Sequence, residues 1–269
     1  MILNRASEKD KTALLVEGDK DGRIYRRVVD PLHCRAFPSS NRATAEEALG
    51  ILKSAAQPGV LAIVDADTDY LANKHSTDPD LLVTHTRDSE GILLQSEALR
   101  KVLVEFDIDG AFGTSPELAA IRAVAPIGYI RFIAEQKKRM VRISQLDFAR
   151  FVDPSTLQCD TKQMCKHIST LTIGSVVTAD EYHAELIALM ASGDDPYKVA
   201  RGHDATSLLA WALPIVAGKK RKHGTRITAE VVESYLRVAY PDDAFAKCEL
   251  YQKIRQWESR NAPYKVLIK

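Results

Sequence analysis

The stretch VLAIVDADTDY ends an apolar run with three acidic residues at every second position, Asp65, Asp67 and Asp69. Carboxylates held this close raise one another's pKa, so all three stay ionised only if a cation compensates them. A hard divalent ion such as Mg²⁺ or Mn²⁺ suits them, because it takes oxygen ligands and keeps water molecules for a phosphate. The residue types therefore indicate a metal site that hydrolyses a phosphate ester.

Acids also follow the other strands that the sequence predicts. Short apolar runs at Ala13–Val16 and Val60–Val64 are typical of strands buried on both faces of a parallel sheet. A third, shorter strand is expected within Asp80–Thr86. Because the carboxyl ends of parallel strands meet at one edge of the sheet, the acids that follow them are expected to converge there. These acids are Glu17, Asp65, Asp67, Asp88 and Glu90.

Helical patterns alternate with the strands throughout residues 1–106. One helix is expected from Asp19 to about Val29, a second begins at Thr44, and a third occupies residues 88–106. A further strand is expected at His33–Phe37. This alternation predicts an α/β fold with a mainly parallel sheet flanked by helices.

The rest of the chain, residues 107–269, is expected to form a mostly α-helical C-terminal extension, because its apolar residues recur at spacings of three and four. Only Lys138–Ser144 has the pattern of a strand. We therefore expect two domains, residues 1–106 with the acids and residues 107–269. The expected helical segments are Ser115–Gln136, Asp160–Leu171, Ala179–Ala191, Ala205–Ala217 and Ala229–Trp257.

The composition is that of an ordinary globular protein. The 269 residues are 45% hydrophobic and carry a net charge of +1, so no whole-protein field attracts nucleic acid or membrane. No stretch approaches the ~18 apolar residues of a membrane span, and the first residues lack an export signal. The 4 cysteines are scattered, which fits a reducing compartment. We expect a soluble cytoplasmic protein with no membrane partner.

Other acidic motifs and simpler structural roles compete with the metal-site interpretation. An EF-hand loop requires Gly where Tyr70 stands and Glu where Ser76 stands, so the triplet is not one. A haloacid-dehalogenase-like phosphatase also has Asp-x-Asp after an apolar strand, but it prefers Thr or Val at the position of Asp69. The sequence therefore supports that class of enzyme only weakly. Taken singly, a Glu-Gly pair after a strand is usually a turn, and an Asp is often a helix cap. Asp21 is accordingly either a metal ligand or the cap of its helix.

The order of these parts resembles the TOPRIM domain of topoisomerases, primases and overcoming-lysogenization-defect (OLD) type nucleases. A strand ends in Glu17-Gly18 with Asp21 just beyond, and a later strand ends in Asp65-x-Asp67. Two later segments, THTRDSEGILL and ARGHDATSLLAWAL, resemble a bacterial family of OLD-like TOPRIM proteins, many of them encoded beside an ABC-type ATPase. With these segments the resemblance extends over most of the chain.

This resemblance implies a metal-dependent nuclease. Glu17 takes the role of general acid/base, Asp65 and Asp67 hold Mg²⁺ or Mn²⁺, and Glu90 completes the site or holds a second ion. The family implies a toxic effector of anti-phage defence that cleaves RNA such as tRNA when a partner ATPase releases it. The alternatives are an OLD-type DNA endonuclease and a non-catalytic module that binds nucleic acid or its partner.

Partners are implied by what the chain lacks and by its helical extension. No GxxxxGK[ST] sequence is present, so the chain is not expected to hydrolyse ATP alone, and the resemblance implies an ABC-type ATPase partner. Helical extensions commonly form dimers, and we expect a homodimer in the active state. Because the net charge is only +1, binding of RNA or DNA requires a local basic segment that contacts the phosphates. The residues expected to contact phosphates are His203, from the family match, and Lys219, Lys220, Arg221, Lys222 and Arg226.

Overall fold

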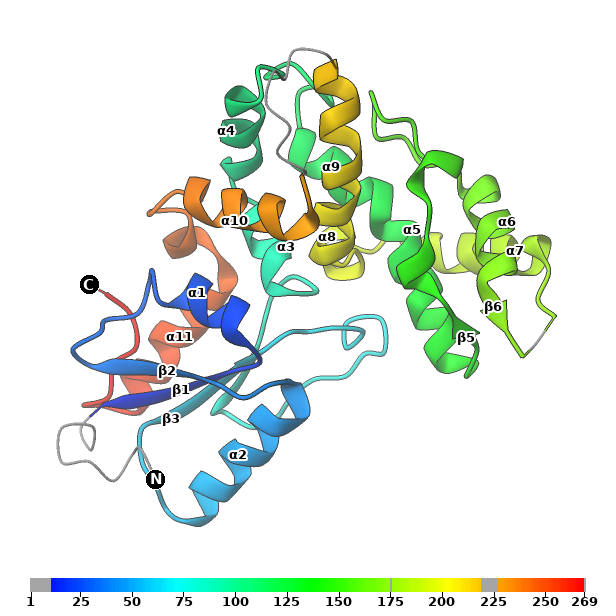
Figure 1. The fold of residues 1–269 in the computed structure, drawn as a ribbon. Helices are drawn as coiled ribbons and strands as arrows, with labels where there is room; N and C mark the ends of the chain where they lie inside the picture. The colour runs from blue at the N-terminus through cyan, green and yellow to red at the C-terminus, as the bar shows by residue number, and fades with distance from the viewer. Residues whose placement is uncertain (1–10, 175, 219–226, 269) are drawn as a thin grey trace. The chain divides into compact units, whose positions relative to one another are not determined.

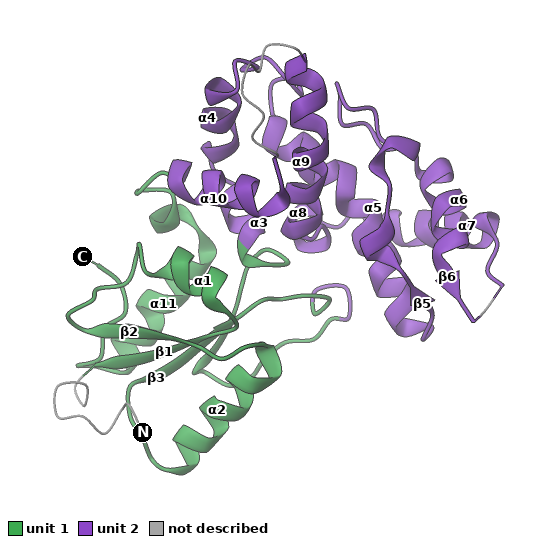
Figure 2. Cartoon of the chain, viewed as in Figure 1, with its two compact units in different colours: residues 1–69, 73–89, 241–269 green, residues 70–72, 90–240 purple. Residues whose placement is uncertain are grey.

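The computed structural model describes residues 11–174, 176–218 and 227–268. The chain forms two compact units, shown in different colours in Figure 2. One unit contains the parallel sheet and is built from both ends of the chain, whereas the other is mostly helical. Unit 1 comprises Met1–Asp69, Asn73–Ser89 and Pro241–Lys269, and unit 2 comprises Tyr70–Ala72 and Glu90–Tyr240.

The sheet of unit 1 has four parallel strands in the order β2-β1-β3-β4. All residues of the two central strands are buried, which is why their sequences are continuously apolar. The α/β fold with a parallel sheet flanked by helices is therefore confirmed. The strands are β1 (Thr12–Val16), β2 (Cys34–Pro38), β3 (Val60–Val64) and β4 (Leu81–Val83).

Helices cover both faces of this sheet. Helix α2 (Arg42–Ser54) packs on one face, where Leu49 meets Leu15 of β1 and Ala62 of β3. Helices α1 (Asp19–Tyr25) and α11 (Glu249–Arg260) lie on the other face (Figure 1). Because alternate strand residues point to opposite faces, an apolar strand can bury itself against both helical layers at once.

The C-terminal segment is an integral part of unit 1. Trp257 of α11 is fully buried, and its Nε1–H donates a hydrogen bond of 2.9 Å to Asp80 Oδ1 beside β4. Gly59 has a φ of +68°, and a Cβ at this position would lie 2.3 Å from the ring of Tyr264. The turn before β3 therefore requires glycine both for its backbone conformation and for the close approach of that ring.

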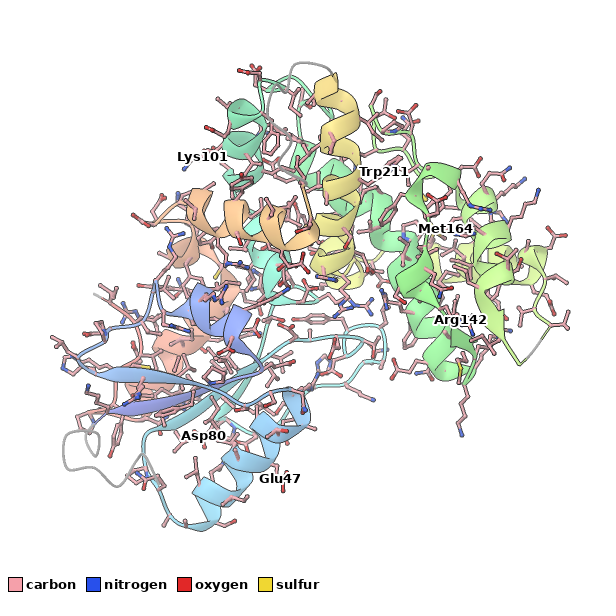
Figure 3. The ribbon with its side chains drawn as sticks, viewed as in Figure 1. Glu47, Asp80, Lys101, Arg142, Met164 and Trp211 are labelled. Atoms are coloured by element: carbon pink, nitrogen blue, oxygen red, sulfur yellow. The ribbon has the colours of Figure 1, made fainter. Side chains whose placement is uncertain are left out.

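Replacing Trp257 by Phe is expected to lower the free energy of unfolding of unit 1 by about 1–3 kcal/mol, because it leaves a cavity and removes the bond to Asp80. Urea unfolding followed by circular dichroism measures this loss. The matched control is Trp211→Phe in unit 2. Trp211 is labelled in Figure 3, and its side chain is only half-buried. An equal loss in both variants contradicts a specific role for Trp257.

Unit 2 is mostly helical. The strand expected near Lys138 is the short β5 (Met140–Val141), which pairs antiparallel with β6 (Thr172–Ile173). In the described parts of the chain, no helix combines the length and the apolar character needed to cross a membrane. The helices are α3 (Ser89–Leu94), α4 (Ala98–Glu105), α5 (Pro116–Gln136), α6 (Thr161–Leu171), α7 (Ala179–Met190), α8 (Pro196–Val199), α9 (Gly202–Ala217) and α10 (Ala229–Ala239). Helices α5, α6, α7 and α9 match the segments expected from apolar spacing to within a few residues, whereas the helix expected over residues 88–106 is divided into α3 and α4.

The compact units differ from the domains expected at residues 1–106 and 107–269. Helix α4, which precedes that boundary, packs on α5 and α10 and so belongs to unit 2. The apolar stripe expected at Ala229–Trp257 is divided at Tyr240, because the residue before Pro241 is disfavoured in a helix. The chain after Pro241 returns to unit 1, where α11 packs on β4.

Candidate acidic site

The sheet brings Glu17 and Asp65 together. Each follows the carboxyl end of a central strand, and the parallel register pairs Val16 of β1 with Ile63 of β3. Glu17 Oε1 accepts a hydrogen bond of 2.8 Å from the backbone N–H of Asp65. Two acids that are far apart in sequence therefore lie at the same edge of the sheet, where α/β proteins bind their ligands.

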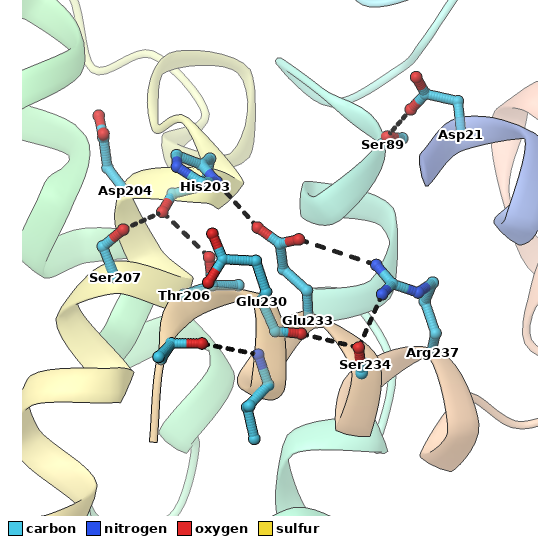
Figure 4. A network of polar contacts seen from close by, with 12 residues as sticks. Asp21, Ser89, His203, Asp204, Thr206, Ser207, Glu230, Glu233, Ser234 and Arg237 are labelled. Carbon is cyan, nitrogen blue, oxygen red and sulfur yellow. Dashed lines mark hydrogen bonds and ion pairs between the residues drawn. The ribbon is translucent and has the colours of Figure 1, made fainter. Parts of the chain in front are cut away.

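Ser89 links this pair to a third acid. Its backbone N–H donates to Asp65 Oδ1 at 3.0 Å, and its hydroxyl donates to Asp21 Oδ1 (Figure 4). The other carboxylate oxygen of Asp21 accepts from the N–H of Gly18 at 3.1 Å, which caps α1. Asp21 thus forms the N3 contact of the capping box of α1, and its role as a metal ligand stays a prediction. Ser89 was not singled out from the sequence, although it lies within the TOPRIM-like segment between two acids.

The alternating acids do not continue as an extended strand. Asp67 is exposed, has a φ of +47°, and donates its N–H to the carbonyl of Arg87 at 2.8 Å, so the chain turns there. Asp69 then points to Arg42, whose Nη2 donates to Asp69 Oδ2 at 2.7 Å. The third acid is thereby engaged in an ion pair with a side chain of α2.

Arg42 is the principal cation at this edge, and the sequence analysis did not identify it. Besides Asp69, it contacts the backbone carbonyl of Asp65 through Nη1 at 3.0 Å. Its Nε donates to Glu46 on the next turn of α2 at 2.7 Å. The planar guanidinium thus binds two carboxylates and one carbonyl at once, which a lysine ammonium cannot reproduce in the same geometry. Arg42 therefore neutralises Asp69, one of the three closely spaced acids.

The pKa of Glu17 is raised from its ordinary value of 4.5 to about 7. Burial of the carboxyl is the main cause, and the nearby charges of Asp67 and Asp21 add to it. The hydrogen bond from Asp65 and the charge of Arg42 oppose the shift without cancelling it. Glu17 therefore exchanges a proton near neutral pH, which is what a general acid/base requires.

Buried threonines hold the turn after β3. Thr84 is fully buried; its hydroxyl accepts from the N–H of Ala66 at 3.0 Å and donates to the carbonyl of Thr86 at 2.8 Å. The hydroxyl of Thr86 donates to the carbonyl of Asp88 at 2.6 Å. These bonds order the segment that leads to Ser89, which explains why a run of polar residues follows β4 inside the protein.

The remaining predicted residues are placed differently. Glu90 is buried in the first turn of α3 and belongs to unit 2, whereas Glu17, Asp21, Asp65 and Asp67 belong to unit 1. His203 lies in the first turn of α9, also in unit 2. The basic residues Lys219, Lys220, Arg221, Lys222 and Arg226 lie outside the described residues.

The acids fit a hydrated ion better than a closed ligand cage. Within residues 11–174, 176–218 and 227–268, no three or more His, Cys, Asp or Glu side chains form a metal-ligand group. Oxygens of Glu17, Asp65 and Asp21 accept hydrogen bonds from N–H or O–H groups. Mg²⁺ in phosphate-handling sites is often held by one or two carboxylates together with water and substrate. The oxygen donors of this edge fit that type of binding.

Two comparisons with known proteins found no match. The chain matches no protein-family model, and no curated protein is significantly similar to it. The interpretation of the site therefore depends on the residues and contacts described above.

Proposed function

We propose that the chain is a metal-dependent nuclease that hydrolyses phosphodiester bonds. The observation that carries this proposal is the hydrogen bond from the backbone N–H of Asp65 to Glu17 at the carboxyl edge of the sheet, where burial and the charges of Asp67 and Asp21 raise the pKa of Glu17 to about 7. Acids that are partly buried, electrostatically coupled and placed at this edge are typical of a functional site rather than of a solvated surface.

Each residue of the edge has a distinct role in this proposal. Asp65 and Asp67 hold Mg²⁺ or Mn²⁺, and Glu17 transfers a proton to or from the attacking water or the leaving oxygen. The bound ion supplies positive charge at the phosphate oxygens and a more acidic water. Ser89 orients the Asp65 carboxylate, and Arg42 fixes the turn that carries it. Glu90 remains a prediction of the sequence resemblance.

The family resemblance supports a more specific proposal. In size and layout the chain resembles the TOPRIM effector of the PARIS anti-phage defence system. We therefore propose a cytoplasmic defence effector that cleaves RNA such as tRNA, works as a homodimer, and is restrained by an ABC-type ATPase. An OLD-type DNA endonuclease uses the same residues and differs only in its substrate.

The test is cleavage by the purified protein. Total tRNA, single-stranded DNA and duplex DNA are incubated with Mg²⁺, with Mn²⁺, or with EDTA. We expect cleavage of tRNA with either metal, none in EDTA, and none with Asp65→Asn. Cleavage of DNA alone selects the DNA endonuclease, and failure to cleave any of the three polymers in either metal rejects the enzyme.

A non-catalytic TOPRIM-like module is the second candidate. It is favoured by the structural contacts of two of the acids, since Asp69 forms an ion pair with Arg42 and Asp21 bonds Gly18 and Ser89. In this case the protein binds tRNA or DNA without cutting it, and Asp65→Asn leaves that binding unchanged. Filter binding in parallel with the cleavage assay separates the two candidates.

A further inference from the structure

A row of cations lines the outer side of helix α1 in unit 1. Lys20, Arg23 and Arg26 recur at every third position, and Arg27 lies in the turn that follows the helix. The three arginines are exposed, and Lys20 is partly exposed. Because residues three and four apart lie on the same side of a helix, the four cations form one surface, which we call the α1 stripe.

The other side of α1 is apolar and is covered by unit 1 itself. Ile24 and Tyr25 are buried, and the helix packs against β1 and β2. The Tyr25 ring also meets Phe245 edge to face, with 6.3 Å between the ring centroids. A helix that binds a membrane surface turns its apolar side chains toward the lipid. Since α1 turns them into the core of the protein, its outward charges suit a polyanion in solution rather than a lipid surface.

The arginines in the middle of the stripe are not neutralised by neighbouring acids. Arg26 Nε donates to the carbonyl of Gly22 at 3.0 Å, which is an uncharged partner. Among the residues that the structure describes, no carboxylate forms an ion pair with Arg23 or Arg26. Arg27 pairs with Asp242, whose side chain is 97% exposed, so solvent screens this pair. The stripe therefore presents a positive potential at the surface.

The stripe begins beside the candidate acidic site. Glu17 comes three residues before Lys20, and Asp21 in the same helical turn contacts Ser89. Acids thus lie at the start of α1, and cations follow toward its end. From Lys20 to Arg26 the helix rises about 9 Å, a distance over which one strand of a duplex carries about three phosphates. A polynucleotide that follows the stripe therefore brings its next phosphates to the acids.

We propose that the α1 stripe binds the phosphate backbone of the nucleic acid next to the phosphodiester that the acidic site cuts. Guanidinium groups suit this contact, because they donate two parallel hydrogen bonds to one phosphate. Such contacts position a polymer and do not read its sequence. The inference rests on the proposed function, which supplies the polymer. It goes further because neither the acids nor the basic segment expected at residues 219–226 assigns a role to these arginines.

The first test measures binding of a fluorescein-labelled tRNA to the full chain in EDTA, over a series of salt concentrations. We expect the double variant Arg23→Gln, Arg26→Gln to bind roughly tenfold more weakly at about 0.1 M salt. The slope of log affinity against log salt should become shallower by about 1.5, because each lost phosphate contact removes about 0.7 to 0.9. The matched control is Arg260→Gln, Lys265→Gln, which removes two exposed cations of unit 1 outside the stripe. An equal change in both double variants overturns the proposal.

A charge-conserving variant separates the loss of charge from a loss of folding. Arg23→Lys, Arg26→Lys keeps both positive charges and should keep the salt slope of the wild type. Polyglutamate is tested in parallel as an acidic polymer without phosphates. If Arg23→Gln, Arg26→Gln loses affinity for polyglutamate and not for tRNA, the stripe binds an acidic protein and the proposal is overturned. Unchanged binding of tRNA by this variant overturns it as well.

Cleavage of tRNA in Mn²⁺ is measured in the same series. Arg23→Gln, Arg26→Gln should raise KM by roughly tenfold and leave kcat within about twofold, because the stripe holds the flanking phosphates equally before and during the reaction. Weaker binding by this variant without any wild-type cleavage rejects the proposed nuclease and keeps the stripe. Wild-type cleavage with unchanged binding by the variant keeps the nuclease and rejects the stripe.

Discussion

Glu17→Gln is expected to lower the rate of metal-dependent cleavage by roughly 10²- to 10⁴-fold, the usual contribution of a general acid/base. The amide keeps the size of the side chain and its ability to accept the hydrogen bond from Asp65, but it cannot transfer a proton. A divalent cation held by Asp65 and Asp67 opposes the burial that raises the pKa of Glu17 to about 7, so a wild-type rate that rises with pH below 7 indicates that the ionised carboxylate is the active form. The variant should lose this pH dependence along with its activity.

The matched control is Glu47→Gln, which removes a carboxylate from the exposed surface of α2 (Figure 3). Its cleavage rate should equal that of the wild type, because Glu47 contacts neither acid of the edge. Cleavage by Glu17→Gln at the wild-type rate contradicts the assignment of Glu17. If Glu17→Gln also loses its circular dichroism signal, the loss of cleavage is due to unfolding. Glu17→Asp then serves as the second variant.

The same substitution should change how stability depends on pH. The folded pKa of Glu17 lies above its unfolded value of 4.5, so the folded state binds more protons between these two values. Its stabilising contribution is complete below pH 4.5 and is lost as pH rises through about 7. At pH 8 we expect Glu17→Gln to be the more stable protein, by on the order of 1 kcal/mol because solvent screens a half-buried group. Thermal melting at pH 5 and pH 8 measures the difference, and parallel melting curves contradict it.

Arg42→Lys is expected to weaken binding of Mn²⁺ by roughly 10- to 100-fold, the usual effect of removing a residue that orients metal ligands. The lysine keeps the positive charge but cannot contact Asp65, Asp69 and Glu46 together. The turn that carries Asp65 and Asp67 is then less well fixed. Isothermal titration with Mn²⁺ alone measures the affinity without any substrate.

Glu46→Gln provides the control for Arg42. It removes only the contact at 2.7 Å to the Arg42 Nε and leaves the two contacts to the turn in place. We expect its Mn²⁺ affinity to stay within about twofold of the wild type, since a partly exposed ion pair contributes little. Equal weakening by both variants means that the contact between Arg42 and Glu46, and not the two contacts of Arg42 to the turn, sets the affinity.

The sheet could be predicted from the sequence because its signal is local. A strand buried on both faces must be continuously apolar, and Leu14 and Ala62 at the centres of β1 and β3 have an exposure of 0%. The placement of α11 has no such signal. Trp257 meets Asp80 across 177 positions of the chain, and an amphipathic helix does not reveal which surface it covers.

The candidate site was predictable only in part, because only some of its residues have a local signal in the sequence. Glu17 and Asp65 follow strands, so parallel pairing alone brings them together. The bonds that organise them come from Arg42 and Ser89, residues whose types are ordinary in a first helical turn or a polar loop. Asp69 shows the limit most clearly. Asp69 has the same spacing as Asp65 and Asp67. The positive φ at Asp67 nevertheless turns the chain, and the Asp69 carboxylate then forms an ion pair with Arg42.

Unit 1 is built from segments near both ends of the chain, and this affects how it folds during translation. Translation delivers β1, β3 and their acids early, but α11 emerges only after all of unit 2 has been made. Until then, Asp80 lacks Trp257 and Val29 lacks its bridge to Leu267. The sheet of a nascent polypeptide therefore stays without the packing of α11 on β4 until all of unit 2 has been translated.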